Sequence, residues 1–344
     1  MKRLALITGA AAALAAAAVI LERKLIAAPR YEGPKSDHFD GARFHNKSGW
    51  QPQGSFLKWQ MNRQIGFWRK WVDAPPGPPP PGRVDGGGLR LTFVNHATML
   101  IQMDGVNVLT DPMWSERCSP VPFAGPKRHR PPGIRFEDLP KIDVVIVSHN
   151  HYDHLDLPTL RALQKRDHPR IITPLGNSAV MKRGGVKDAE DVDWWQEKKV
   201  DQIRFTAVPA QHFCARGVSD RDATLWGGFV ISGRSGNVYF AGDTGWGQHF
   251  SEIGQRFAPI RLALLPIGAY LPRWFMKTVH IAPEEAVDAH VALQARISVP
   301  MHYGTFNLGD DGETEPVQDL RRAIAEKRAT NIKILDFGEG WDLP

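Results

Sequence analysis

Four residues that can bind a metal ion lie within six positions of this sequence. They occur in the segment SHNHYDHLD, which begins at the end of the apolar, β-branched run Ile142–Ser148, typical of a buried strand. In a chain leaving such a strand, His149 and His151 project to the same side. Asp153 and His154 fall on the following turn and can face a neighbouring point. One short segment can therefore supply two metal ions, and its position after a buried strand distinguishes it from a solvated histidine tract.

Three further candidate ligands occur later in the chain, each after a predicted strand. They are His212 in PAQHF, Asp243 in FAGDTG and His302 in MHYGTF. Taken alone, a histidine of this kind more often packs in the interior or lies at the surface, but in series with the first segment these residues predict a metal site. Asp111, at the end of the predicted strand Val108–Asp111, is the candidate to accept a hydrogen bond from a ligating histidine. The alternative is that Asp111 only caps a turn.

The composition is that of a globular protein without a thiolate cluster. The 344 residues are 42% hydrophobic and 23% charged, which excludes a disordered or fibrous chain. Only Cys118 and Cys214 are present, so a disulfide framework is not expected and a four-cysteine metal site is excluded. Residues 1–90 hold 14 basic and 6 acidic side chains of a chain whose net charge is +6, so the remainder is slightly acidic. A nucleic-acid-binding core is therefore not expected.

The N-terminal part has a different character. Lys2 and Arg3 precede the uncharged run Leu4–Leu21, which predicts a hydrophobic anchor over residues 1–24, or alternatively a cleaved secretory signal. Residues 25–88 are predicted to form a basic, aromatic arm that includes the proline-rich spacer PPGPPPP. Within this arm, Ser55–Val72 is predicted to form a helix on a bilayer surface, or alternatively a helix packed on the following domain. With the N-terminus inside, the domain at residues 89–344 is placed on the periplasmic side.

Short strands and helices alternate through residues 89–344, which predicts an α/β fold. The domain opens with three strands in series, and Asp104-Gly105 predicts a tight hairpin between the second and the third. Pro283 is predicted to begin a helix, because Glu284 and Glu285 follow it in the first turn. The predicted strands are residues 89–94, 99–103, 106–110, 142–148, 203–208, 229–232, 238–241 and 262–266, and a further helix is predicted at 157–165.

The motif HxHxDH, followed in order by the three later candidates, resembles the signature of the metallo-β-lactamase superfamily. The resemblance implies a four-layer αβ/βα sandwich, to which the predicted membrane-associated N-terminal extension would be attached. It also implies two zinc ions per chain, although manganese or iron suits a site with this much carboxylate. Two such ions can share a water and lower its pKa. The implied ligands are His149, His151 and His212 for one ion and Asp153, His154 and His302 for the other, with Asp243 bridging them.

From Asn95 to about Gly340 the chain resembles, more closely, the family of N-acylphosphatidylethanolamine-hydrolysing phospholipases D. This resemblance rests on sequence segments that a zinc site does not itself require, among them LTDPMWSERCSP, GPKRHR, PIGAYLPRWFMK and HIAPEEAV. It implies a phosphodiesterase that releases N-acylethanolamine and phosphatidic acid, with a phospholipid substrate, a membrane surface and a homodimer as partners. One departure is Asn95, where the family pattern has glycine, but asparagine tolerates the same turn.

The resemblance also implies residues that contact the substrate. Tyr152 and His280 fall on the family's substrate-contacting positions, and His280 is expected to bind phosphate or to protonate the leaving group. Arg216 and Arg273 are weaker candidates for phosphate contacts. An apolar channel for the lipid is expected to be lined by Trp194, Trp195, Trp226, Trp274 and Phe275, and core packing is the alternative for each of them.

Two other functions are compatible with parts of the sequence. The same metal site on this fold could hydrolyse a lactone or another phosphodiester, because a fold does not fix the substrate. A non-catalytic lipid-binding protein without metal is the second alternative, and the complete set of candidate ligands argues against it.

Overall fold

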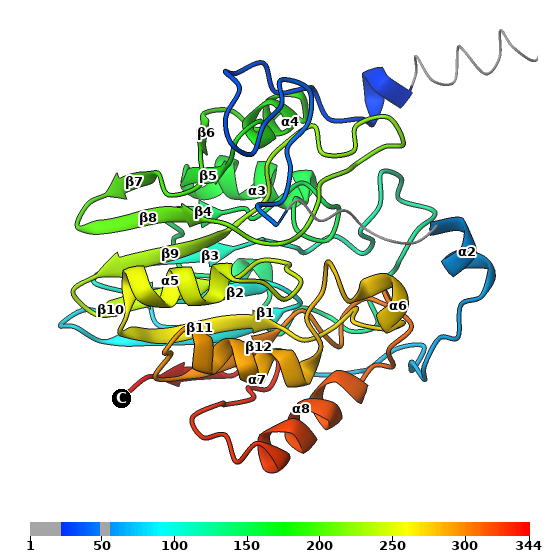
Figure 1. Cartoon of the computed structure of the whole chain (residues 1–344). Helices are drawn as coiled ribbons and strands as arrows, with labels where there is room; N and C mark the ends of the chain where they lie inside the picture. Colours follow the sequence, from blue (N-terminus) through cyan, green and yellow to red (C-terminus); the bar gives the residue numbers. More distant parts are fainter. Residues whose placement is uncertain (1–21, 49–55) are drawn as a thin grey trace, which may run out of the picture.

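Two β-sheets pack face to face in the computed structural model, which describes residues 22–48 and 56–344 (Figure 1). The first sheet has the order β13-β1-β2-β3-β4-β5-β6 and the second β12-β11-β10-β9-β8-β7. The strands of the first sheet are β1 (Leu89–Asn95), β2 (Thr98–Met103), β3 (Val106–Thr110), β4 (Val144–Ile146), β5 (Arg170–Pro174), β6 (Ala189–Val192) and β13 (Gly340–Asp342). Those of the second are β7 (Glu197–Val200), β8 (Ile203–Val208), β9 (Gly228–Gly233), β10 (Gly236–Phe240), β11 (Ile260–Pro266) and β12 (Ser298–Met301).

Helices cover the outer face of each sheet. On the first sheet lie α3 (Leu157–Asp167) and α4 (Asn177–Arg183), and on the second lie α5 (His249–Phe257), α7 (Pro283–Ala292) and α8 (Glu315–Glu326). Shorter elements are α2 (Phe56–Met61), α6 (Arg273–Met276) and the 3-10 turn at Phe136–Asp138. The main core lies between the sheets, where side chains such as Phe93 and Phe229 are fully buried. The predicted α/β fold with two sheets and covering helices is confirmed.

The first three strands form the predicted antiparallel meander. Strand β1 pairs with β2, and β2 pairs with β3 across the turn at Asp104-Gly105. Both turn residues have positive φ, 51° and 78°, which suits the aspartate-glycine sequence. The expected strand at 142–148 is shorter than predicted, because β4 ends at Ile146 and Ser148 already turns to donate its N–H to the Asp111 carboxylate.

The structure of residues 56–72 differs from the long helix that we predicted there. Only α2 (Phe56–Met61) is helical, and the chain then runs extended along the loop at 310–313. The Gly66 N–H donates to the Asp310 carbonyl, and a Cβ at Gly66 would come within 2.5 Å of the Gly312 backbone. The indole of Trp68 also donates to the Asp311 carbonyl at 2.9 Å. These contacts agree with the alternative, a segment packed on the following domain.

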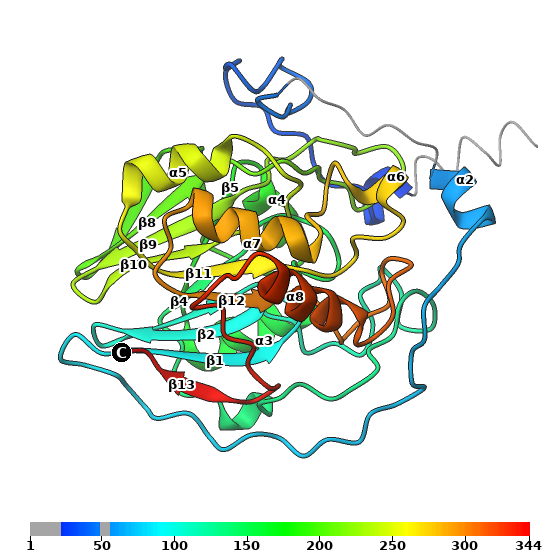
Figure 2. The same ribbon diagram turned by 60° about the horizontal axis from the view of Figure 1, so that its bottom comes forward.

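The proline-rich spacer also lies against the domain. It follows the segment after α2 and runs past the first sheet to β1 (Figure 2). The Gly77 N–H donates to the Gly133 carbonyl at 2.7 Å, and the side chain of Gln102 donates to the Pro81 carbonyl at 2.7 Å. The spacer is therefore hydrogen-bonded to the domain it precedes.

The predicted localisation requires a correction. We expected membrane association through a hydrophobic segment at residues 1–24, with the domain on the periplasmic side. Within residues 22–48 and 56–344, no helix is long and apolar enough to cross a bilayer. All but the last three residues of the predicted anchor lie outside the described part of the chain. This finding contradicts the localisation, which is not retained.

Candidate metal centre

The loop that follows β4 turns sharply and divides its candidate ligands into two groups. The Leu155 N–H donates to the His151 carbonyl at 2.8 Å and the His154 N–H donates to the same oxygen at 3.2 Å. This turn sends the side chains of Asp153 and His154 to one side and leaves His151 on the other. The two groups predicted from the motif thus face two neighbouring points, and the rings of His149 and His154, one from each group, lie 4.2 Å apart.

The first group, here called the imidazole cluster, consists of His149, His151 and His212. His151 Nδ1 lies 2.8 Å from His149 Nε2 and 3.3 Å from His212 Nε2. His212 belongs to the segment after β8 and comes from the second sheet. Its other ring nitrogen, Nδ1, donates to the Val279 carbonyl at 2.9 Å, which leaves Nε2 free to face the cluster.

The second group, here called the carboxylate cluster, consists of His96, Asp153, His154 and His302. Asp153 Oδ2 lies 3.1 Å from His154 Nε2 and 3.3 Å from His302 Nε2. His302 follows β12 on the second sheet, and His96 follows β1 on the first. Both sheets therefore contribute ligand atoms at the edge where the strands end.

Asp243 lies between the two clusters. Its Oδ2 is 3.2 Å from His154 Nε2 and 3.8 Å from His212 Nε2, and its Oδ1 is 3.2 Å from His302 Nε2. The preceding Gly242 has φ +61°, and a Cβ there would lie 2.7 Å from the Ser148 Cβ. Glycine thus allows the loop after β10 to approach the loop after β4, and the motif FAGD is explained by this close contact.

The arrangement fits two divalent metal ions. Within each group of candidate residues the ligand atoms lie within 4.8 Å of one another. Two of these atoms, His154 Nε2 and Asp243 Oδ1, are buried and have no hydrogen-bond partner among the described residues, although charged groups lie nearby. Buried polar atoms without a partner are costly, and a coordinated cation would satisfy them. The mixture of imidazole and carboxylate suits zinc, manganese or iron.

At the imidazole cluster and at Asp243, the protonation states also favour metal binding. Burial, assisted by neighbouring histidines, lowers the pKa of His149 well below its ordinary value. Burial likewise lowers the pKa of His151 to about 4 and that of His212 to about 3. Burial acts to raise the pKa of Asp243, but the charges and hydrogen bonds of His154 and His302 together outweigh it and hold that pKa well below the ordinary range. The imidazole cluster is therefore neutral and the aspartate ionised, which are the forms that bind metal.

Asp111 contacts a candidate ligand directly. Its Oδ2 lies 2.6 Å from His154 Nδ1, and the same carboxylate accepts hydrogen bonds from the N–H and the hydroxyl of Ser148, each at 2.7 Å. The His154 Nδ1–H donates to this carboxylate, so that Nε2 points at the centre. The geometry suits the role that the sequence suggested for Asp111, which stays a prediction.

The two expected substrate-contacting residues lie at the edge of the centre. His280 Nδ1 is 3.9 Å from Asp243 Oδ2, is buried, and has no hydrogen-bond partner in residues 22–48 and 56–344. Tyr152 lies under the guanidinium of Arg216, 3.8 Å from the ring centre. The structure therefore brings His280 to the candidate ligands from the segment before α7, and places Tyr152 at the mouth of a cavity.

The two arginine candidates are occupied by protein groups. Arg216 donates to the carbonyls of Asn150 and Leu155, at 2.7 and 3.1 Å, and so supports the metal-binding loop. Arg273 donates to the His280 carbonyl at 3.0 Å and pairs with Glu285 at 2.8 Å. These contacts assign both arginines a supporting position around the site and give no support to direct phosphate contact.

Of the five residues predicted to line an apolar channel, two are buried in the core. Trp194 and Trp226 are buried against Phe39 and Phe44. Phe275 stacks on Trp59 at 5.1 Å. Of the remaining two, Trp195 lies under Arg256 and Trp274 is half exposed. For the buried pair the alternative of core packing holds, because these rings fill the contact between the N-terminal arm and the domain.

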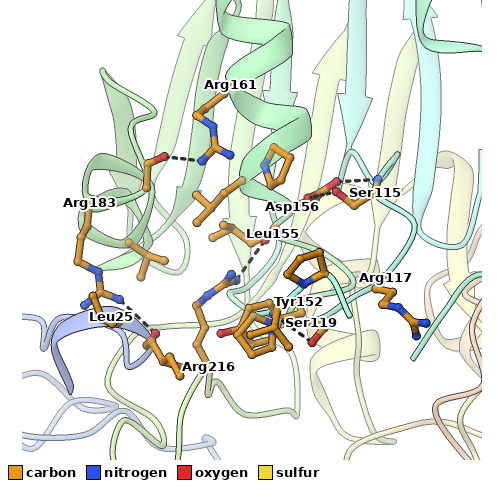
Figure 3. A pocket seen from close by; sticks show the side chains of 18 of the residues that line it. Leu25, Ser115, Arg117, Ser119, Tyr152, Leu155, Asp156, Arg161, Arg183 and Arg216 are labelled. Carbon is orange, nitrogen blue, oxygen red and sulfur yellow. Dashed lines mark hydrogen bonds between the residues drawn. The ribbon is translucent and has the colours of Figure 1, made fainter. Parts of the chain in front are cut away.

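A different cavity adjoins the metal-binding loop (Figure 3). Its volume is about 840 Å³, within the range of small-molecule sites. Apolar side chains such as Leu25 and Leu155 line it together with cationic Arg117 and Arg183, and Tyr152 of the metal-binding loop also lines it. None of the candidate metal ligands lines this cavity, so it is a neighbour of the centre and not the centre itself.

Sequence reasoning missed His96. Its Nε2 donates to Asp153 Oδ2 at 2.8 Å, and its ring lies 4.0 Å from that of His302. Burial lowers its pKa to about 3, so the ring is neutral. In the sequence, only the backbone of the turn at Asn95 and His96 drew attention. The position of His96 was nevertheless a usable signal, because His96 follows a strand end as the other candidates do.

The fold and the paired clusters define a class of protein. Residues 106–303 match the family model of the β-lactamase superfamily domain, and this is more than half of the chain. The chain therefore belongs to the metallo-β-lactamase superfamily, and it is a metal-dependent hydrolase of that superfamily.

Individual relatives narrow this class. The chain is 40% identical over 271 residues to N-acyl-phosphatidylethanolamine-hydrolyzing phospholipase D 1 of Caenorhabditis elegans, covering 74% of this chain and 76% of that protein. It is 31% identical over 258 residues to a metal-dependent hydrolase of Methanopyrus kandleri, covering 74% and 100%. An isothiocyanate hydrolase from Delia radicum gut bacteria has a TM-score of 0.58 at 23% identity, over 73% and 98%, and supports the fold alone.

Proposed function

We propose that this protein is a zinc-dependent phosphodiesterase that hydrolyses N-acylphosphatidylethanolamine to N-acylethanolamine and phosphatidic acid. The observation that carries the proposal is the 40% identity to a phospholipase D of that specificity over three quarters of the chain. The paired clusters supply the chemistry that such a reaction needs. Formation of a dimer stays a prediction.

The centre would hold two zinc ions, one on the imidazole cluster and one on Asp153, His154 and His302, with Asp243 between them. Bound there, two zinc ions would supply a water of lowered pKa and positive charge for the phosphate oxygens. Asp243 contributes by holding the two halves in register. Asp111 keeps the His154 ring in the orientation and tautomer that ligation requires.

His280 is the residue that we expect to contact the phosphodiester. Burial lowers its pKa to about 3, although Asp243 opposes the shift, so the ring is neutral at pH 7. A neutral ring with a free nitrogen can hydrogen-bond to a substrate oxygen. This protonation state favours binding of the phosphate group over protonation of the leaving group.

The cavity beside Tyr152 is the candidate site for part of the lipid. Its apolar lining suits hydrocarbon. Tyr152 joins this cavity to the metal-binding loop. A phospholipid with its phosphodiester at the centre would therefore place one of its chains along this cavity.

The test is release of N-acylethanolamine and phosphatidic acid from defined N-acylphosphatidylethanolamine in mixed micelles. We compare the wild type with Asp243→Asn and measure the zinc content of each. Product from the wild type and a loss of about 10³-fold or more in the variant would support the proposal. A zinc-loaded wild type that hydrolyses lactones or other phosphodiesters, and not this lipid, would contradict the substrate and leave the metal centre intact.

A further inference from the structure

The N-terminal arm reaches the candidate centre at one residue, Asn46. Residues 22–48 precede the segment matched by the family model, which begins at residue 106. The side chain of Asn46 is nevertheless buried, with 9% of its surface exposed, next to the backbone of His212. Nothing in the metal-binding motif requires this contact.

Asn46 makes a paired hydrogen bond to the His212 backbone. Its Nδ2 donates to the His212 carbonyl at 2.9 Å, and its Oδ1 accepts from the His212 N–H at 3.0 Å. Within the described part of the chain, the peptide groups of His212 have no other hydrogen-bond partner. A side-chain amide carries the same donor and acceptor as a peptide group, so Asn46 takes the place of a neighbouring strand.

The His212 backbone depends on hydrogen bonds from a side chain because the sheet has already ended. Strand β8 stops at Val208, and three residues separate its end from His212. Beyond the strand, the ring of His212 is held by its Nδ1–H, which donates to the Val279 carbonyl. Asn46 holds the backbone and Val279 holds the ring, and together they determine where Nε2 points.

Asn46 is itself fixed by packing of the arm. The Phe44 N–H donates to the Asp222 carbonyl at 2.9 Å, and Phe44 packs with Phe39 against Trp226. The Trp226 indole donates to Asn46 Oδ1 at 3.2 Å. The amide is therefore oriented from the domain as well as from its own segment, and it cannot turn without breaking buried hydrogen bonds.

We infer that Asn46 is a positioning residue of the metal centre, which sets the backbone of His212 so that its Nε2 completes the imidazole cluster. The N-terminal arm is then part of the centre and not only an appendage. The inference rests on the proposed function in one respect, that His212 is a metal ligand. It predicts that a change at Asn46 weakens one of two metal sites selectively.

The experiment is a stepwise zinc titration of the full chain in competition with a chromophoric chelator. Asn46→Ala removes both hydrogen bonds, and Asn46→Asp keeps only the acceptor. Phe39→Leu is the matched control, because it loosens the same arm and does not touch His212. A His151→Ala variant identifies which binding step belongs to the imidazole cluster. The cobalt-substituted absorption spectrum reports the ligand geometry independently of activity.

For Asn46→Ala we expect the imidazole-cluster step to weaken by about 10- to 100-fold, the scale for residues that orient metal ligands. The other step should change little, Asn46→Asp should fall between, and the cobalt spectrum should change in Asn46→Ala. Unchanged zinc binding in Asn46→Ala would overturn the inference, as would an equal loss in Phe39→Leu. A wild type that binds no second ion would contradict the dinuclear centre of the proposed function. A wild type that binds two ions, with a selective loss in Asn46→Ala, would support both the centre and the role of Asn46.

Discussion

The imidazole cluster and the carboxylate cluster lie side by side and are opposite in electrostatic character. Burial lowers the pKa of His151 to about 4. Burial acts in the same direction on His302, but Asp243 and Asp153 outweigh it and raise its pKa to about 9. The imidazole cluster is thus neutral without metal, whereas the carboxylate cluster is balanced by ion pairs. Two ions bound here would meet different ligand charges, and the one beside Asp153 should be held more tightly.

The largest effect should come from removing one ligand of each cluster. His151→Ala and Asp153→Asn should each lower phosphodiester hydrolysis by about 10³-fold or more, because both ions act together. Metal content should separate the two variants. His151→Ala should keep the more tightly held ion, whereas Asp153→Asn should lose it and bind the remaining ion weakly.

Elemental analysis after dialysis against a weak chelator measures this difference. His45→Gln is the control for loss of an imidazole, because His45 lies in the N-terminal arm and is not a candidate ligand. Equal retention of metal by the two ligand variants would show that the charge difference between the clusters does not govern affinity.

Asp111→Asn should have the next largest effect. The amide keeps the shape of the carboxylate and removes the charge that His154 Nδ1 contacts at 2.6 Å. We expect metal affinity at the carboxylate cluster to fall by about 10- to 100-fold. The loss at the imidazole cluster should be smaller, because the Ser148 hydroxyl links Asp111 to His149 Nδ1, which lies 2.9 Å from it. Zinc titration checks this, and an equal loss at both binding steps would contradict it.

The candidate metal ligands could be identified from the sequence, and most of the contacts that hold them in place could not. His149, His151, Asp153 and His154 lie within one motif, and His212, Asp243 and His302 each follow a predicted strand in the order that the superfamily shows. The contact between Asn46 and His212 joins residues 166 positions apart, and neither residue belongs to a pattern that predicts the other. His96 follows a strand end as the other candidates do, but nothing in the sequence joins it to its partner Asp153.

The fold shows the same limit. Strands with clear alternation and a tight turn, such as β1 to β3, were predicted within a residue or two. The segment 56–72 has helical spacing of its apolar residues, yet after Met61 it is extended, because Gly66 fits against the backbone of Gly312 and pairs with Asp310. Tertiary hydrogen bonds determine the conformation of such a segment, and the local spacing of apolar residues does not predict them. Trp194 and Trp226 were placed in the lipid channel because the arm that buries them was not known to pack there.

The stability of the metal-free protein should depend on pH in opposite directions at the two clusters. The folded pKa of His302 is raised to about 9 from an ordinary value of 6.5. Its contribution is therefore fully present below pH 6.5 and is lost as the pH rises through 9. The folded pKa of His212 is lowered to about 3, so its contribution is present above pH 6.5 and is lost on acidification.

Thermal unfolding of chelator-treated protein from pH 5 to 10 measures this. The contribution of His302 is on the order of 3 kcal/mol, which corresponds to a decrease of roughly 5 °C in Tm between pH 6.5 and 10. The decrease should be smaller in His302→Gln, and it should disappear when zinc is bound. A wild type and a His302→Gln variant with the same alkaline slope would contradict the assignment of charge to this cluster.

The smallest effect should come from His96, which lies outside the predicted set of ligands and touches only the carboxylate cluster. Its hydrogen bond to Asp153 Oδ2 orients a carboxylate that His154 and His302 also contact. Loss of one hydrogen bond among several costs about 1 kcal/mol, so His96→Phe, which keeps a ring in the buried space, should weaken metal binding about fivefold. A loss of 100-fold or more would instead show that His96 is itself a ligand. In that case the carboxylate cluster would supply three imidazoles as its neighbour does, and the two clusters would differ only by the charge of Asp153.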